Sequence, residues 1–468
     1  MEYSYDHPHV AAERVECLVA KKEIEIERLA SDGAGVGYID GKATFVPGML
    51  PGEKGTVRIT EEKKSYQRGD VITIFNPSPQ RQTPPCPVYQ ECGGCNLQHM
   101  KYEYTLHWKR QWVEDALRRI GGLRNIIVEP VLGLEEPWRY RNKAVLHRDR
   151  EGRFGYYRPK TNDVVPFADC LLLSESTNRR IRKLQQTIVT SCPDIKTATV
   201  RESSNGKGLI LLEGDLPEPS IIHTLTKDED FSPSVCSITY PRGKMDFAGS
   251  GTPYLNEYLD DICFRVSPRA FLQVNPIQTR KLYSLILEYA KLKGTEEVWD
   301  LYCGIGTITL LLAKRAQKVV GIEENPYAVE DAVYNARENK ITNVNFLQGK
   351  VEETLKNKGR IEGDIGRIAG TPDIVVTDPP RAGMDPLVVQ KLRQIKPEKI
   401  IYVSCNPATL ARDLKMLVSG EVGNDGGRGS KKRENTADRG IYVVEKVQPV
   451  DFFPWTSHVE CVELMTRL

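Results

Sequence analysis

Residues 297–323 read EVWDLYCGIGTITLLLAKRAQKVVGIE, and this stretch decides the fold. An apolar strand runs into a turn that carries Gly304 and Gly306. A helix begins at Thr307, and a second apolar strand ends at Glu323. Glycines in such a turn let a ligand approach the backbone, and the first turn of the helix offers free N–H groups. The pattern predicts a strand–helix–strand unit that holds a nucleotide-like ligand at its glycine turn.

Two carboxylates narrow the choice of ligand. Asp300 stands at the tip of the first strand, and Glu323 follows 23 residues later, where a carboxylate accepts hydrogen bonds from both hydroxyls of a ribose. A dehydrogenase would carry G-x-G-x-x-G, but the turn reads GIGTIT and lacks the third glycine. The run D-x-x-C-G-x-G-T is instead typical of S-adenosylmethionine-dependent methyltransferases. A glycine turn without a ligand is the third interpretation, and the two acids speak against it.

The same pattern continues through the C-terminal part of the chain. Near-continuous apolar strands alternate with amphipathic helices over residues 261–468. Such alternation predicts a parallel sheet covered by helices on both faces, in an α/β class I (Rossmann-like) methyltransferase domain. Residues 419–440 are rich in glycine and charge, so we expect a surface insertion without a catalytic role.

Two further strands of this region end in reactive residues. DIVVTDPPRAG ends a strand at Asp378, and KIIYVSCNPATLARD places Cys405 just past another. The carboxyl ends of the strands line the ligand crevice in a doubly wound sheet, so both residues should face the cofactor. A packed strand-end cysteine is the commoner fate of a single cysteine, but this position favours a reactive thiol.

A possible base lies near the C-terminus. Glu460 stands in FFPWTSHVECVELMTRL beside apolar Val459 and Val462, where a glutamate can have a raised pKa and act as a base. The alternative is a strand-edge glutamate that faces solvent. A thiolate, a base and a methyl donor together suit carbon 5 of uracil, which becomes nucleophilic once a cysteine adds to carbon 6.

The N-terminal third has a different character. Short β-rich runs separated by Gly, Pro and Asp turns over residues 15–76 predict a compact barrel or sandwich, and a proline-rich linker follows. Its two interpretations are a purely structural barrel and a nucleic-acid-binding barrel of the OB type. Residues 77–260 read as a mixed α+β region with a helix from Tyr102 to Ile120, whose apolar face holds Leu106, Val113, Leu117 and Ile120.

Three cysteines open the central region. Cys86, Cys92 and Cys95 have the spacing C-x5-C-x2-C, which suits an iron–sulfur cluster or zinc and needs a fourth ligand from elsewhere. A zinc-dependent enzyme therefore stays open at this point.

Composition limits the partners. The 468 residues carry a net charge of +2, and no apolar run is long enough to span a membrane, so we expect a cytoplasmic protein without a membrane partner. Residues 137–160 hold eight Lys or Arg and only two acids. They also hold five aromatic residues: Trp138, Tyr140, Phe154, Tyr156 and Tyr157. This mixture predicts an RNA track with stacked bases, and an exposed basic hairpin with core aromatics is the alternative.

Together, DLYCGIGTITL, DPPRAG, SCNPATLARD and HVECV resemble the RNA uracil-5-methyltransferase family over nearly the whole chain. The resemblance is to its 23S ribosomal RNA branch, with an N-terminal TRAM barrel and a [4Fe–4S] cluster in an α+β central domain. It implies that Cys405 is the nucleophile and Glu460 the base. It also implies S-adenosylmethionine contacts from Gln273, Tyr302, Glu323 and Asp378, and cluster ligation by Cys86, Cys92, Cys95 and Cys170.

The expected activity is methylation of carbon 5 of a uridine in 23S ribosomal RNA. The uridine should lie in a loop or an otherwise unpaired segment, because a stacked base cannot reach the thiol. A tRNA uridine methyltransferase is the rival within the class. A non-catalytic RNA-binding protein with a vestigial methyltransferase fold is the rival from another class.

Overall fold

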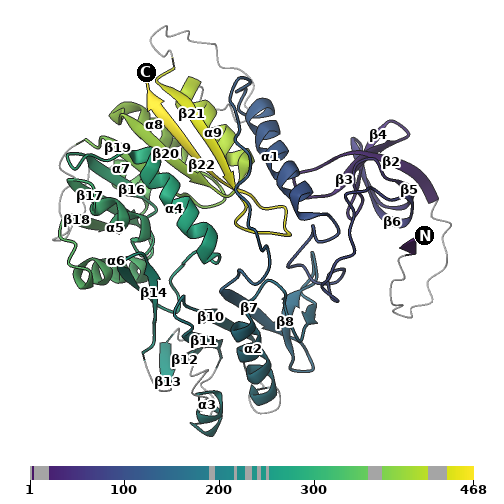
Figure 1. The fold of residues 1–468 in the computed structure, drawn as a ribbon, viewed down its shortest axis with the longest axis horizontal. Helices are drawn as coiled ribbons and strands as arrows, with labels where there is room; N and C mark the ends of the chain where they lie inside the picture. The colour runs from purple at the N-terminus through teal and green to yellow at the C-terminus, as the bar shows by residue number, and fades with distance from the viewer. Residues whose placement is uncertain are drawn as a thin grey trace.

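The computed structural model describes residues 3–4, 21–188, 195–214, 219–226, 234–239, 244–248, 252–356, 371–419 and 440–468. Figure 1 shows a small barrel at one end, a mixed sheet below and a helix-covered sheet at the other end. The predicted insertion falls largely on residues 420–439, which lie outside the described residues.

A seven-stranded sheet forms the C-terminal part, and its strand order is β18-β17-β16-β19-β20-β22-β21. The first five strands run parallel, and β22 pairs antiparallel with both β20 and β21. The order reverses between β16 and β19, which opens a crevice beyond the carboxyl ends of those strands. The strands are β16 (Glu297–Leu301), β17 (Lys318–Glu323), β18 (Val344–Gln348), β19 (Ile374–Thr377), β20 (Lys399–Ser404), β21 (Tyr442–Val450) and β22 (Glu460–Arg467).

Helices cover both faces of this sheet, as predicted. One apolar core lies between the sheet and α4, α5 and α6, and the other between the sheet and α1, α7, α8 and α9. The helices of the C-terminal part are α4 (Pro276–Ala290), α5 (Thr307–Ala313), α6 (Pro326–Glu338), α7 (Val351–Lys356), α8 (Pro386–Ile395) and α9 (Pro407–Ser419). The hairpin of β14 (Leu255–Leu259) and β15 (Ile262–Val266) packs against α6.

The N-terminal barrel follows the predicted strands closely. Its sheet order is β1-β6-β4-β3-β2-β5, and an additional pairing of β5 with β6 closes it. Its core holds Ile24, Ile26, Val57 and Ile74, which alternate with exposed residues along their strands. The strands are β1 (Tyr3–Ser4), β2 (Lys21–Leu29), β3 (Gly35–Ile39), β4 (Lys42–Val46), β5 (Lys54–Glu62) and β6 (Tyr66–Asn76).

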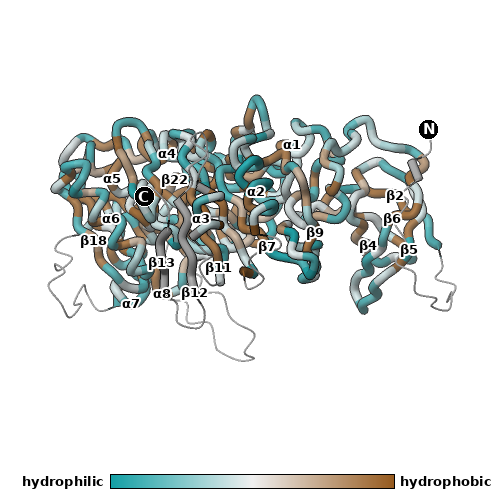
Figure 2. The backbone as a smooth tube through the Cα atoms, turned by 90° about the horizontal axis from the view of Figure 1, so that it is seen from below, coloured by the Kyte–Doolittle hydropathy of each residue, from teal (hydrophilic) through white to brown (hydrophobic). Residues whose placement is uncertain are grey.

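The central part is mixed α+β, as predicted. Its seven-stranded sheet has the order β13-β12-β11-β10-β7-β8-β9, and α2 packs on it. The elements are β7 (Lys143–Arg148), β8 (Phe154–Tyr157), β9 (Val164–Pro166), α2 (Glu175–Ile188), β10 (Thr197–Glu202), β11 (Gly208–Glu213), α3 (Pro219–Thr226), β12 (Ser234–Thr239) and β13 (Lys244–Ala248). Figure 2 shows hydrophobic segments concentrated inside each part of the chain.

Helix α1 (Tyr102–Arg119) connects the parts. Val113 and Leu117 are buried in the core that α9 also lines, as their predicted apolar face requires. Ile120 is 47% exposed, so its place on that face was wrong. The buried stripe instead includes Trp108, Lys109 and Trp112, because the helix has neighbours on more than one side. None of the helices in the described ranges is long and apolar enough to cross a membrane.

Candidate active site

One cavity of about 850 Å³ lies at the reversal of strand order in the C-terminal sheet. It brings together all six residues predicted as catalytic or cofactor-binding, although they come from separate strands and loops of the sequence. These are Gln273, Tyr302, Glu323, Asp378, Cys405 and Glu460. The clustering follows from the parallel sheet, because strands that run the same way end at the same edge.

The glycine turn shapes one half of the cavity. Gly304 and Gly306 have φ angles of +55° and +81°, in the left-handed region that glycine adopts without strain. Tyr302 has a φ of +64°, an unusual conformation for a non-glycine residue and one that clusters at functional sites. Space is open where a Cβ on Gly304 would lie, so a ligand can contact the backbone there.

Glu323 closes this half from the tip of β17. Its Oε2 accepts a hydrogen bond from the N–H of Gly304 at 3.0 Å, and its Oε1 accepts one from Asn325 at 2.8 Å. These bonds hold the carboxylate against the glycine turn while it still lines the cavity. The arrangement suits the ribose of a nucleoside cofactor, whose hydroxyls require a fixed acceptor.

Asp300 lies behind the cavity wall and does not line it. Thr309 Oγ1 donates to its Oδ2 at 2.5 Å, while Oδ1 has no hydrogen-bond partner. Burial, with a smaller contribution from Asp378, raises the pKa of Asp300 to about 7. A buried carboxyl with a free oxygen beside the glycine turn fits a site that binds a cationic ligand.

Cys405 follows β20 and is half-buried on the cavity wall. Burial raises the pKa of its thiol to about 11, and the carboxylates of Glu460 and Asp378 add to this increase. Arg381 acts in the opposite direction. The free enzyme therefore holds Cys405 mainly as a thiol, and positive charge brought into the cavity favours the thiolate.

Glu460 is the first residue of β22 and is only 5% exposed. Because β22 lies between β20 and β21, the alternative of a solvent-facing edge glutamate is wrong. Burial, followed by the charge of Asp378, raises the pKa of Glu460 to about 8. A carboxyl with a pKa near neutrality can take up and release a proton under physiological conditions.

The sequence did not assign several other residues of the cavity. Phe271 is 64% exposed at its rim, and Phe453 also lines it. His458 lies 3.1 Å from Arg381, and burial followed by the charge of Arg381 lowers the pKa of His458 to about 4. The sequence signal for these residues is their position next to predicted site residues, as with Phe271 near Gln273.

The four predicted metal ligands also meet. Cys86, Cys92, Cys95 and Cys170 line a second cavity of about 130 Å³, together with Arg141 and Gln98. Among the described residues, no three His, Cys, Asp or Glu side chains are arranged to hold a single metal ion. Four thiols thus line one cavity, and thiolates are the ligands of both zinc sites and iron–sulfur clusters.

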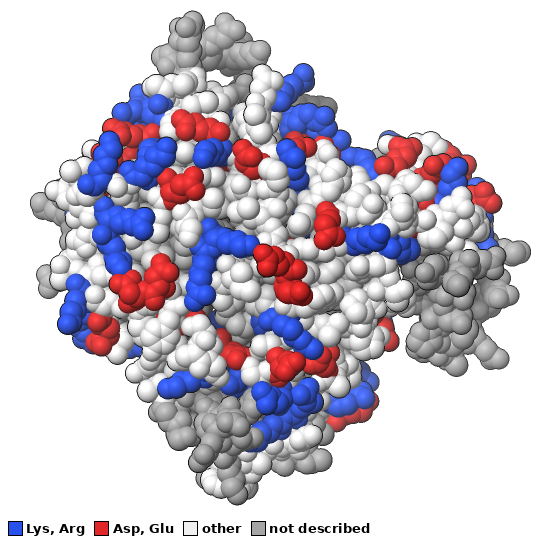
Figure 3. Space-filling model, viewed as in Figure 1, with Lys and Arg blue, Asp and Glu red and all other residues white. Residues whose placement is uncertain are grey.

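The basic and aromatic stretch of residues 137–160 is only partly a surface. Tyr140 and Phe154 are buried, and Trp138 stacks on Trp455 inside the protein. Tyr157 is exposed and stacks on His147, with 3.9 Å between the ring centroids. Figure 3 shows basic side chains scattered among acidic ones on the viewed face. Tyr140 and Phe154 are thus core aromatics, as in the alternative, and the RNA track stays a prediction.

Comparison with known proteins identifies the family. The model of tRNA (uracil-5-)-methyltransferases matches residues 252–422, and the TRAM domain model matches residues 16–72. A Bacillus cereus protein named as an uncharacterized RNA methyltransferase is 38% identical, with 95% of this chain and 96% of that protein covered. The chain belongs to the RNA uracil-5-methyltransferase family. Its members are S-adenosylmethionine-dependent enzymes that methylate carbon 5 of uracil, which confirms the predicted class of enzyme.

Two further similarities extend over the whole length of this methyltransferase. A Clostridium tetani protein, also named as an uncharacterized RNA methyltransferase, is 38% identical over 94% of this chain and 95% of its own. The crystal structure of Pyrococcus abyssi tRNA (uracil-54, C5)-methyltransferase with S-adenosyl-L-homocysteine matches with a TM-score of 0.71 and 26% identity. That match covers 95% of this chain and 100% of the archaeal one.

Proposed function

We propose that this enzyme methylates carbon 5 of a uridine in RNA through a covalent bond between Cys405 and carbon 6 of the base. The observation that carries the proposal is that one cavity is lined by the thiol of Cys405, the carboxyl of Glu460 and the proposed cofactor-binding residue Glu323. Methylation of an exocyclic nitrogen would need no such thiol.

The glycine turn and Glu323 would hold the cofactor, and Gln273, Tyr302 and Asp378, which line the same cavity, would surround it. S-adenosylmethionine supplies an electrophilic methyl group and a positively charged sulfonium. That charge opposes the effect of Asp378 and Glu460 on the thiol and so favours ionisation of Cys405.

Cys405 and Glu460 then act in sequence. The sulfur forms a bond to carbon 6, and the electron pair of the carbon 5–carbon 6 double bond moves onto the carbonyl at carbon 4 as an enolate. Carbon 5 uses this electron pair to bond to the methyl group. The sulfonium–methyl bond of the cofactor would break, and its electron pair would stay on the sulfur of the S-adenosylhomocysteine that leaves. Glu460 removes the proton from carbon 5, the double bond re-forms, and the carbon–sulfur bond breaks with its electron pair returning to Cys405. Glu460 finally releases the proton to solvent.

The proposed substrate is a loop or unpaired uridine of 23S ribosomal RNA. A TRAM domain and four cysteines around one cavity support this choice, since minimal tRNA enzymes lack both. A tRNA substrate is the second candidate, because the tRNA methyltransferase of Pyrococcus abyssi matches 95% of this chain and is therefore not a minimal enzyme.

The two substrates are separated by mapping methyluridines in both RNA pools. A strain that lacks the gene should lose a 5-methyluridine from 23S ribosomal RNA and keep its tRNA methyluridines. Plasmid-borne wild type should restore the modification, and Cys405→Ala should not. Loss from tRNA alone would assign the second candidate, and no loss from either pool would contradict the proposed activity.

We further propose that Cys86, Cys92, Cys95 and Cys170 hold a [4Fe–4S] cluster. Arg141 at the same cavity would offset part of its negative charge. Protein purified without oxygen should be brown and contain about four irons per chain. A colourless protein with one equivalent of zinc would overturn the assignment.

A further inference from the structure

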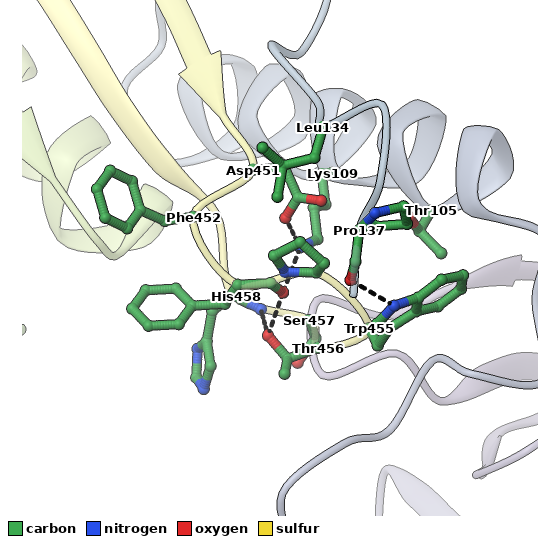
Figure 4. Close-up of polar contacts among 12 residues, drawn as sticks. Thr105, Lys109, Leu134, Pro137, Asp451, Phe452, Trp455, Thr456, Ser457 and His458 are labelled. Carbon is green, nitrogen blue, oxygen red and sulfur yellow. Dashed lines mark hydrogen bonds and ion pairs between the residues drawn. The ribbon is translucent and has the colours of Figure 1, made fainter. Parts of the chain in front are cut away.

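The segment between β21 and β22, residues 451–459, is shown in Figure 4. It contributes side chains to one side of the proposed active-site cavity. Phe453 and His458 belong to it, and Glu460 follows directly. Neither a helix nor a strand supports these nine residues, so side chains from other parts of the chain must fix their path.

A buried ion pair fixes the start of the segment. Lys109 of α1 and Asp451 are both fully buried, and Nζ lies 2.5 Å from Oδ1. The same Nζ donates to the carbonyl of Phe453 at 3.0 Å. Tyr102 donates its hydroxyl to Oδ2 of Asp451 at 2.7 Å, so two side chains of α1 hold Asp451 and the carbonyl of Phe453 in one polar network.

A second set of contacts fixes the middle of the segment. Trp455 has a φ of +66° and stacks on Trp138, with 4.4 Å between centroids and 20° between ring planes. Its indole N–H donates to Pro137 at 2.9 Å. Asn96, the neighbour of Cys95, donates its backbone N–H to Trp455 and accepts from the N–H of Ser457 at 2.9 Å.

Stability alone gives no reason for a charged pair at this place. Removing two charges from water costs about as much as their attraction returns, so apolar residues of similar size often serve the fold equally well. The Lys109 ammonium does one thing that an apolar residue cannot do. It donates hydrogen bonds to both Asp451 and the carbonyl of Phe453, on the two sides of the turn in the segment. That turn sets the direction in which the chain enters the cavity.

We propose that Lys109 and Asp451 are positioning residues for the base Glu460. The inference rests on the proposed role of Glu460. Cys405 stands between β20 and α9, whereas His458 belongs to the segment and Glu460 follows it directly. Loosening the segment should therefore slow removal of the carbon 5 proton much more than addition of the thiol. A displacement of about 1 Å at a reacting group can reduce a rate by about 100-fold.

The test uses the full-length enzyme with RNA that contains the mapped uridine. Lys109→Met leaves the charge of Asp451 buried and unpaired, so it lowers thermal stability as well. The double variant Lys109→Met/Asp451→Asn leaves no unpaired charge, and we expect its melting temperature to stay near that of the wild type. Its turnover should fall 10- to 100-fold, with an enzyme–RNA adduct that accumulates on a denaturing gel.

Two control variants separate the possible outcomes. Glu53→Gln breaks a comparable buried pair, in which Glu53 of the barrel is 0% exposed and its partner Arg81 is 7% exposed. This variant should lower stability without adduct accumulation. Glu460→Gln should trap the adduct fully. If Glu460→Gln traps it and the folded double variant turns over at the wild-type rate without adduct, the positioning role is refuted. If Glu460→Gln traps nothing, the proposed base itself is refuted.

Discussion

Replacing Glu460 by glutamine should stabilise the protein while it removes the base. The carboxyl is 5% exposed and faces Asp378 in the cavity, which raises its pKa from 4.5 to about 8. In the unfolded chain the same carboxyl ionises near pH 4.5. Between these two values the folded state keeps a proton that the unfolded state has released, so the free energy of unfolding falls as the pH rises.

The size of the effect follows from the two pKa values. Between pH 4.5 and 8, retention of this proton lowers the free energy of unfolding by about 1.4 kcal/mol per pH unit. The total reduction is about 5 kcal/mol above pH 8. Glutamine is neutral at every pH and removes this cost. We therefore expect Glu460→Gln to match the wild type near pH 4.5 and to become progressively more stable up to pH 8.

Urea unfolding from pH 5 to 8.5, without cofactor or RNA, measures the difference. Glu463→Gln is the matched control, because Glu463 lies on the same strand, is fully buried and has both oxygens without a hydrogen-bond partner. It should also stabilise the protein at high pH, yet keep normal turnover. Glu23→Gln, at an exposed position of the barrel, should change nothing. If the difference in free energy of unfolding between Glu460→Gln and the wild type does not vary with pH, the reasoning is refuted.

Other variants and conditions test the remaining groups of the site. Cys405→Ala should abolish methylation while the Kd for S-adenosylmethionine stays within about threefold, as calorimetry would report; residual turnover above 1% would exclude the thiol mechanism. The wild-type rate should rise by at least about tenfold per pH unit below pH 8, because the Glu460 carboxyl must be ionised and formation of the Cys405 thiolate adds to the increase. A flat pH profile in timed assays would argue against Glu460. Glu323→Ala should weaken cofactor binding about 10- to 100-fold because the acceptor for the ribose hydroxyls is lost. A Kd for S-adenosylmethionine that equilibrium dialysis finds unchanged would contradict this role. Cys170→Ser should lower the iron content of anaerobic protein, and full iron occupancy would remove Cys170 from the ligand set.

The grouping of the candidate site residues at one cavity was predictable because it depends on short sequence patterns. Glu323, Asp378 and Cys405 each follow an apolar strand, and the parallel sheet brings such positions to one edge. The barrel strands were predictable for a similar reason, since β-rich runs alternate there with turn residues.

The contacts that hold the segment before Glu460 were not predictable. Lys109 reads as a solvent-facing residue of an amphipathic helix, and its partner Asp451 is 342 positions away. Nothing local distinguishes a lysine that will be buried from one that will be exposed. The aromatic residues of the basic stretch could not be sorted from the sequence for the same reason. Only burial in the folded protein distinguishes a core residue such as Phe154 from an exposed one such as Tyr157.

The central claim is a covalent bond between Cys405 and the target base, and RNA with 5-fluorouridine at the mapped position tests it most directly. Fluorine at carbon 5 leaves Glu460 no proton to remove, so the reaction should stop after methyl transfer. With S-adenosylmethionine present, mass spectrometry of the digested complex should find the modified nucleotide, carrying one added methyl group, on the peptide that contains Cys405. Absence of any adduct, or an adduct on a different residue, would contradict the account.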